Sequence, residues 1–160
     1  MTAYAYGLKK NKCFKKIDGI TGDDWGWTNG LYGQGRKEIL GLWAAYGLKS
    51  SCIPIPLVSG TPVGTVIIDY DEKTVTYAMT PLTYMTDVAV WVGDDLLPTD
   101  DGGNYVATPS QFGNVATDIG RQITYKFENI DAFDGDGVYV AAQATVCTNF
   151  CHFNPEADGC

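Results

Sequence analysis

The sequence predicts an all-β protein, an antiparallel β-sandwich of about nine or ten strands with a jelly-roll or immunoglobulin-like arrangement. Apolar and polar residues alternate in several segments, as when Val66, Ile68 and Tyr70 face away from Thr65 and Asp69. This period of two is typical of half-buried strands. The composition agrees, because 10 Tyr, 6 Phe, 4 Trp and 19 Gly accompany few helix-forming residues. A closed β-barrel is the main alternative architecture.

The length of 160 residues suits one domain with a substantial core. We assign residues 1–147 to a single β-sandwich domain. Residues 148–160 form a cysteine-rich C-terminal tail, which we expect to pack on this domain or on a neighbouring subunit.

In the first third of the chain the alternation of apolar and polar residues is short and irregular, so the strands are weakly predicted there. Ala3–Tyr6 alternates and predicts a first strand, which Cys13-Phe14 continues or follows with a second. Trp25–Gly30 predicts a short strand closed by an Asn-Gly turn. The apolar spacing in Lys37–Leu48 also suits a helix, but its two glycines favour a strand.

Stronger signals follow an irregular, proline-containing crossing between residues 52 and 62. Val63–Met79 predicts a hairpin that turns at Asp71–Lys73, and residues 110–117 predict a loop. The remaining predicted strands are separated by turn residues; they are Asp87–Val92, Asn104–Ala107, Gln122–Glu128 and Val138–Val146.

Several fragments carry a family resemblance, and the clearest are Tyr4-Ala5-Tyr6-Gly7, Trp25-Gly26-Trp27-Thr28-Asn29-Gly30, Val63-Gly64-Thr65, Thr74-Val75-Thr76-Tyr77 and Val138-Tyr139-Val140. In this order the chain resembles an uncharacterised class of secreted microbial β-rich domains found in extracellular and cell-surface proteins. These domains contain a WGWTNG box and a VGT…VTY hairpin. The resemblance spans about residues 3–147. It implies export and a surface or matrix role, and it supplies no catalytic residues.

Five cysteines are many for a cytosolic protein of this size; they are Cys13, Cys52, Cys147, Cys151 and Cys160. They predict a secreted protein stapled by disulfides, with one odd thiol and a pairing that stays open. The last three cysteines and His152 could instead bind zinc, although export would oxidise such thiols.

The net charge of −8 argues against nucleic acid, because phosphate binding depends on clustered Lys and Arg. One basic run stands out, made of Lys9, Lys10, Lys12, Lys15 and Lys16. We interpret it as a solvated strand edge whose lysines block unwanted strand pairing, with anion or partner binding as the second interpretation. No stretch approaches the roughly 20 apolar residues of a membrane-spanning helix, so we expect no membrane insertion.

Trp25, Trp27, Asp24 and Asn29 are a candidate sugar-binding set. The two tryptophans share a face if the segment is extended, and paired aromatic rings beside polar groups can stack on a sugar. The alternative is that one or both tryptophans fill the core.

Asp131, Asp134 and Asp136 are a candidate structural calcium site, because calcium prefers closely spaced oxygen ligands. Aspartates in turns also hydrogen-bond to the local backbone, which is the alternative role for this segment. No other cofactor is predicted.

Residues for nucleophilic catalysis are scarce, since His152 is the sole histidine. We predict no enzyme activity and no catalytic residues; a hydrolase based on paired aspartates is the weakest hypothesis.

The resulting prediction is a non-catalytic secreted structural or adhesion protein at the cell surface or in the extracellular space. It is expected to self-assemble, in one form as a filament subunit whose residues 1–8 or 148–160 contact the next copy. Deleting either segment is then expected to leave a folded monomer. The alternative is a carbohydrate-binding module that uses Trp25 and Trp27.

Overall fold

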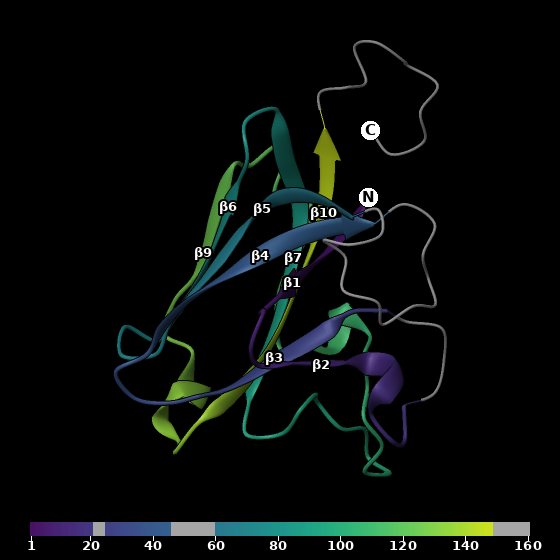
Figure 1. Ribbon diagram of the computed structural model, residues 1–160, viewed down its shortest axis with the longest axis vertical. Coiled ribbons are helices and arrows are strands. Elements are labelled where there is room, and N and C mark those ends of the chain that lie inside the picture. Colours follow the sequence, from purple (N-terminus) through teal and green to yellow (C-terminus); the bar gives the residue numbers. More distant parts are fainter. Residues whose placement is uncertain (21–24, 46–59, 149–160) are drawn as a thin grey trace.

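The computed structural model describes residues 1–20, 25–45 and 60–148 (Figure 1). In these ranges the chain forms ten β-strands, together with the short 3-10 helices η1 (Phe14–Lys16), η3 (Pro109–Gln111) and η4 (Asp131–Asp134). The strands are β1 (Thr2–Tyr6), β2 (Asn11–Cys13), β3 (Trp27–Tyr32), β4 (Lys37–Ala45), β5 (Gly60–Asp69), β6 (Thr74–Met79), β7 (Thr83–Gly93), β8 (Asn114–Ala116), β9 (Thr124–Phe127) and β10 (Val138–Thr148).

The strands form one antiparallel sheet in the order β2-β3-β10-β1-β4-β5-β6-β9, and β7 pairs with β10 and β8. The sheet folds over on itself, so that β6 faces β7 across the core and the Tyr77 hydroxyl donates to the Ala89 carbonyl at 2.9 Å. An isolated bridge between Met85 and Gln122 joins the two layers at one end without closing a barrel. The predicted all-β sandwich is therefore confirmed, and the barrel alternative is not the architecture.

The sheet divides at β10. One side of this strand pairs with β7 from Tyr139 to Thr148. Its other side has two partners, because β3 pairs near Val138 and Val140, whereas β1 pairs from Gln143 to Thr145. The continuations of the two partners separate, with β4, β5, β6 and β9 on the branch of β1 and β2 on the branch of β3, as Figure 1 shows.

Two hydrophobic cores lie on the two faces of the β1, β7 and β10 layer. In β1, Ala3 and Ala5 face the first core, whereas Tyr4 and Tyr6 face the second. The larger first core lies between this layer and β4 to β6. We call the place where β1 and β3 diverge from β10 the fork of the sheet. The second core lies on the opposite face of the layer from the first core. It includes Trp27, Phe14 of η1 and residues of the segment after β7, namely Leu97, Ala107 and Phe112. The central strands are thus buried on both faces, which a simple alternation of apolar and polar residues does not reveal.

Several predicted elements are confirmed. The hairpin of β5 and β6 encloses the predicted turn at Asp71–Lys73, and the ambiguous Lys37–Leu48 segment forms β4 over its described part. β9 and β10 occupy the positions predicted for the last two strands. The predicted tail lies outside the described residues from residue 149 onward.

Three local predictions are wrong. Asn29 and Gly30 lie within β3, not in a turn after it, because the buried Asn29 side chain ties the strand to its neighbours. The Asn104–Ala107 segment contributes only an isolated bridge between Thr99 and Tyr105. The predicted 110–117 loop contains the short strand β8, which forms because the edge of β7 is available to it.

The N-terminal segment is an interior strand of its own sheet. β1 lies between β10 and β4, and the Met1 ammonium donates to the Val146 carbonyl at 2.7 Å. This placement leaves Thr2–Tyr6 no free edge with which to add a strand to a neighbouring subunit, because their backbone groups already pair within the chain. A contact of residues 1–8 with another copy otherwise stays a prediction. Over the described ranges, no helix combines the length and hydrophobicity required to cross a membrane.

Candidate functional site

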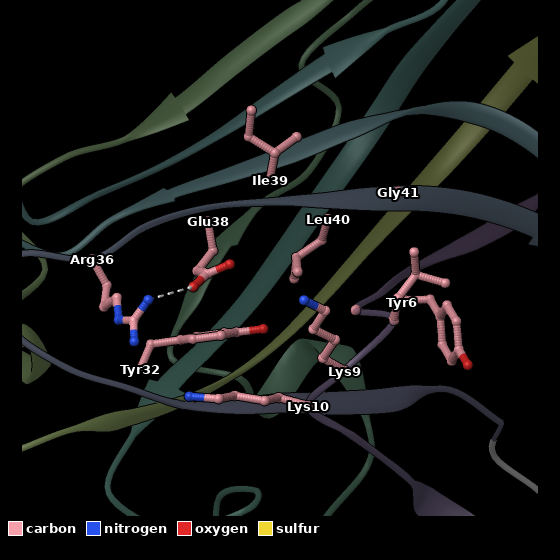
Figure 2. A pocket seen from close by; sticks show the side chains of 11 residues that line it. Tyr6, Lys9, Lys10, Tyr32, Arg36, Glu38, Ile39, Leu40 and Gly41 are labelled. Carbon is pink, nitrogen blue, oxygen red and sulfur yellow. Dashed lines mark ion pairs between the residues drawn. The ribbon is translucent and has the colours of Figure 1, made fainter.

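A pocket of about 560 Å³ opens where the sheet divides (Figure 2). β3 and β4 do not pair with one another, and β1 ends between them at Tyr6, opposite Gly41 of β4. The space left beyond the end of β1 is the pocket. We call it the lysine pocket; its lining residues are Tyr6–Lys10, Tyr32, Arg36 and Glu38–Gly41.

Three cationic side chains come together at this pocket: Lys9 and Lys10 from the β1–β2 connection, and Arg36 from the β3–β4 connection. Lys10 is held in place, because its ammonium donates to the Leu31 carbonyl at 3.0 Å and lies 5.8 Å from the centre of the Tyr32 ring. Among the described residues, the ammonium of Lys9 has no hydrogen-bond or ion-pair partner. It is therefore available to an anionic ligand.

One carboxylate accompanies these cations. Glu38 is half-buried and lies 3.9 Å from the Arg36 guanidinium, a distance at which the pair adds little stability. Burial, followed by the charge of Glu38, raises the pKa of Tyr32 to about 12. Tyr32 therefore keeps its hydroxyl proton throughout the physiological range. The pocket thus combines the cationic donors Lys9, Lys10 and Arg36 with the neutral hydroxyl of Tyr32 and the acceptor Glu38.

The loop that carries the lysines is anchored by backbone and amide groups. The Gly7 N–H donates to Asn29 Oδ1 at 2.7 Å, and Asn11 Nδ2 donates to the Gly7 carbonyl at 2.6 Å. The Gly30 N–H donates to the Lys10 carbonyl at 2.9 Å. These bonds hold both ends of the loop, so the backbone of Lys9 and Lys10 has a fixed position at the edge of the lysine pocket.

The predicted sugar-binding set divides between core and surface. Trp27 is 2% exposed and Asn29 is 0% exposed, so neither side chain can contact a sugar in this structure. The Trp25 and Trp27 rings do lie together, with centroids 5.8 Å apart in an edge-to-face contact. Trp25 is half-buried beside Tyr4, and Asp24 lies outside the described residues. The geometry favours the core role for this segment.

The predicted calcium ligands are not gathered around one point. Asp134 forms an ion pair with Lys73, and this contact raises the pKa of the Lys73 ammonium. Asp131 and Asp136 are exposed. In the described ranges, no group of three or more His, Cys, Asp or Glu side chains is arranged to hold a metal ion. Calcium binding stays a prediction.

Aspartates in other turns confirm the alternative role of this residue type. The Asp100 carboxylate accepts hydrogen bonds from the N–H groups of Gly102 and Asn104 at 2.9 Å, and these contacts lower its pKa. Asp69 likewise accepts from the Glu72 N–H at 3.1 Å.

The cysteine predictions concern mostly residues that the structure does not describe. Cys52, Cys151 and Cys160 lie outside the described ranges. Cys13 on β2 and Cys147 on β10 are both buried; Cys13 is disulfide-bonded, whereas Cys147 is in no disulfide. The pairing of the cysteines stays a prediction, as does the zinc alternative.

The sequence indicated only part of the lysine pocket. Lys9 and Lys10 were visible as a basic run, and Lys12 does lie on the short edge strand β2, as the edge interpretation requires. Tyr32, Arg36 and Glu38 gave no signal, because they join the lysines only through the ending of β1 against β4.

Comparison of the chain with protein families, with curated proteins and with solved structures finds no match. The family resemblance suggested by the WGWTNG box stays a prediction.

Proposed function

We propose that this chain is a secreted, non-catalytic adhesion domain that binds an acidic polysaccharide in the lysine pocket. The supporting observation is the distribution of charge. Three of its eleven Lys and Arg residues line the pocket, namely Lys9, Lys10 and Arg36, and Lys12 lies on the adjoining strand β2. Outside the pocket lining the chain holds eight such residues against eighteen Asp and Glu, since Glu38 also lines the pocket. An acidic protein that concentrates its cations at one pocket attracts anions to that point.

The mixture of groups in the pocket favours an acidic sugar over other anions. A uronic acid carries a carboxylate, which the ammonium of Lys9 and the guanidinium of Arg36 can bind, and hydroxyls, which can donate hydrogen bonds to Glu38. A protein that binds single-stranded nucleic acid commonly offers exposed aromatic rings on which the bases stack. Tyr6 and Tyr32 are only 9% and 3% exposed, so they offer no such platform.

Calorimetric titration with polygalacturonate tests this function, with neutral dextran as the control polymer. We expect binding to polygalacturonate alone, weakening as sodium chloride rises from about 50 to about 300 mM. The double variant Lys9→Ala/Arg36→Ala should lower the affinity at least about five-fold. The variant Arg121→Ala/Lys126→Ala removes the same charge elsewhere and should bind normally. Equal losses in the two variants, or binding to dextran, would contradict the proposal.

Self-assembly is a second candidate function, and it has its own supporting observation. Leu8 and Ile39 line the lysine pocket yet are 81% and 67% exposed. Exposed aliphatic side chains beside a charged pocket suit a protein partner. The acidic surface of a second copy has the complementary charge, and such a head-to-tail contact can propagate into a filament.

A further inference from the structure

A second pocket lies on the other side of the lysine-bearing loop. It has a volume of about 440 Å³, and we call it the Thr28 pocket; its lining residues are Lys9–Lys12, Thr28, Gly30, Leu96 and Tyr139. Lys9 and Lys10 line both pockets. A ligand that passes over these two lysines therefore enters both spaces.

The Thr28 pocket contains a buried hydroxyl that lacks a partner. Thr28 is 1% exposed, and among the described residues its Oγ1 has no hydrogen-bond partner. Lys12 lies directly opposite Thr28 in the β2–β3 ladder, so both side chains are on the same face. A bound carboxylate or hydroxyl, directly or through a water molecule, would pair with both groups. Buried polar groups without partners are rare and call for such an explanation.

Gly30 allows β3 and β10 to approach closely beside this pocket. A Cβ atom at this position would lie 2.7 Å from the Val138 carbonyl oxygen and 3.2 Å from the Tyr139 ring. The φ angle of +135° also disfavours any other residue. The absence of a side chain lets the Tyr139 ring lie against β3, where it forms one wall.

We propose that the Thr28 pocket is a second subsite, and that one extended acidic polysaccharide chain occupies both pockets across Lys9 and Lys10. This inference rests on the proposed function of the lysine pocket. It adds that the ligand is long enough to occupy both pockets. The neutral polar groups of the second pocket, from Asn11, Thr28 and Tyr139, match sugar hydroxyls. Its lysines match a further carboxylate of the same chain. Two linked contacts should raise the affinity of a long ligand over that of a short one.

Titration with galacturonate monomer and with longer oligogalacturonates tests the inference. The affinity should increase with length until both pockets are filled. Lys12→Ala should lower the affinity for the long oligomer about three- to five-fold and leave monomer binding unchanged. Arg36→Ala, which changes only the lysine pocket, should weaken both ligands. Thr28→Val removes the hydroxyl with little change of shape, so it should stay folded while weakening only the long oligomer.

The outcomes separate this inference from the proposed function. If the monomer binds as tightly as the oligomers, or Lys12→Ala and Thr28→Val bind long oligomers normally, the second subsite is wrong and the lysine pocket stands. If no galacturonate binds, the proposed function itself fails. If oligoglutamate of matched charge binds as tightly as oligogalacturonate, the ligand is an acidic polypeptide and the polysaccharide assignment is overturned.

Discussion

Asn29 holds the sheet together at the point where it divides. Its side-chain amide donates to the Ala5 carbonyl at 3.1 Å and to the Val140 carbonyl at 3.3 Å, while its oxygen accepts from the Gly7 N–H. Here β1 leaves β10, and the register between β10 and β3 shifts between Val138 and Val140. One buried carboxamide therefore hydrogen-bonds three backbone groups at this irregular point of the sheet.

Replacing Asn29 by Ala should destabilise the domain by about 2–4 kcal/mol, because a buried group left without a partner costs about 1–3 kcal/mol. Urea unfolding followed by circular dichroism measures the change. The control is Asn11→Ala, which removes an exposed side chain that donates to the Gly7 carbonyl. Equal effects of the two substitutions would show that the fork does not depend on Asn29.

Two buried tyrosines predict a loss of stability in alkali. The pKa of Tyr32 is raised to about 12, and burial raises the pKa of Tyr77 well above its ordinary value. Unfolding returns both to about 10, so the folded state favours the neutral phenols. Their contribution is complete below about pH 10 and is lost as the pH rises towards 12.

Urea unfolding at several pH values checks this prediction. For Tyr32 alone the loss should approach about 2–3 kcal/mol by pH 12. Tyr32→Phe should reduce the loss, since phenylalanine does not ionise. Absorbance at 295 nm should show that the folded protein retains un-ionised tyrosines above pH 11. A variant as alkali-sensitive as the parent protein would contradict the assignment to Tyr32.

The sequence predicted the role of Trp27 but not that of Asn29. The core role of Trp27 was foreseen as an alternative, because a large aromatic residue commonly fills a sandwich. The role of Asn29 was not foreseen, because Asn before Gly is also the commonest signal of a hairpin turn. Only the position of Ala5 and Val140 beside it distinguishes the two, and that proximity is a property of the folded chain.

At the scale of elements, β1 determines both the sheet and the candidate site. Its pairing with β10 and β4 joins the two layers, and its end beside Gly41 opens the lysine pocket. All but the first of its five residues are buried. The segment is thus part of the core, although its sequence is short and its alternating pattern is weak.

Deleting residues 1–6 should abolish folding, and not merely dissociate an oligomer. The deletion exposes the apolar partners of Ala3, Tyr4, Ala5 and Tyr6 and leaves β4 and β10 without a ladder. Near-ultraviolet circular dichroism and amide NMR dispersion should both collapse. Leu8→Ser, at a side chain that is 81% exposed, is the matched control and should keep both signals. A folded truncated protein would mean that β1 is dispensable.

The elements that could be predicted are those whose side chains alternate between core and solvent. In β5, Val66 and Ile68 are buried and Thr65 and Ile67 are half-buried, so the pattern shows both the strand and its buried face. β8 has no such pattern, because it is only three residues long and forms by pairing with the edge of β7. The site could not be predicted in full for a similar reason. It combines loops that are joined only by the non-local pairing of β1.

At the scale of the whole molecule, the uneven charge favours contact between copies at low ionic strength. The lysine pocket is basic, whereas most other charged residues are acidic. Head-to-tail attraction of this kind weakens as salt shortens the range of charge interactions.

Sedimentation velocity at about 20 mM and about 300 mM sodium chloride measures this association. We expect larger species at low salt that disappear in Lys9→Glu/Lys10→Glu. Leu8→Ser should reduce them if the aliphatic rim also contacts the partner. A monomer in both salts would exclude self-assembly through this pocket and leave adhesion as its function.

The pairing of β1 with β10 also sets the order in which the molecule can be built. The Met1 ammonium and the Val146 carbonyl are 145 residues apart in the chain, yet they are hydrogen-bonded. During synthesis the first strand therefore emerges long before its partner exists, and neither core can close until β10 has left the ribosome. Until then β1 can pair only with β4, which is made early. The folded state is therefore completed at the end of synthesis, when β10 is inserted between β1 and β7.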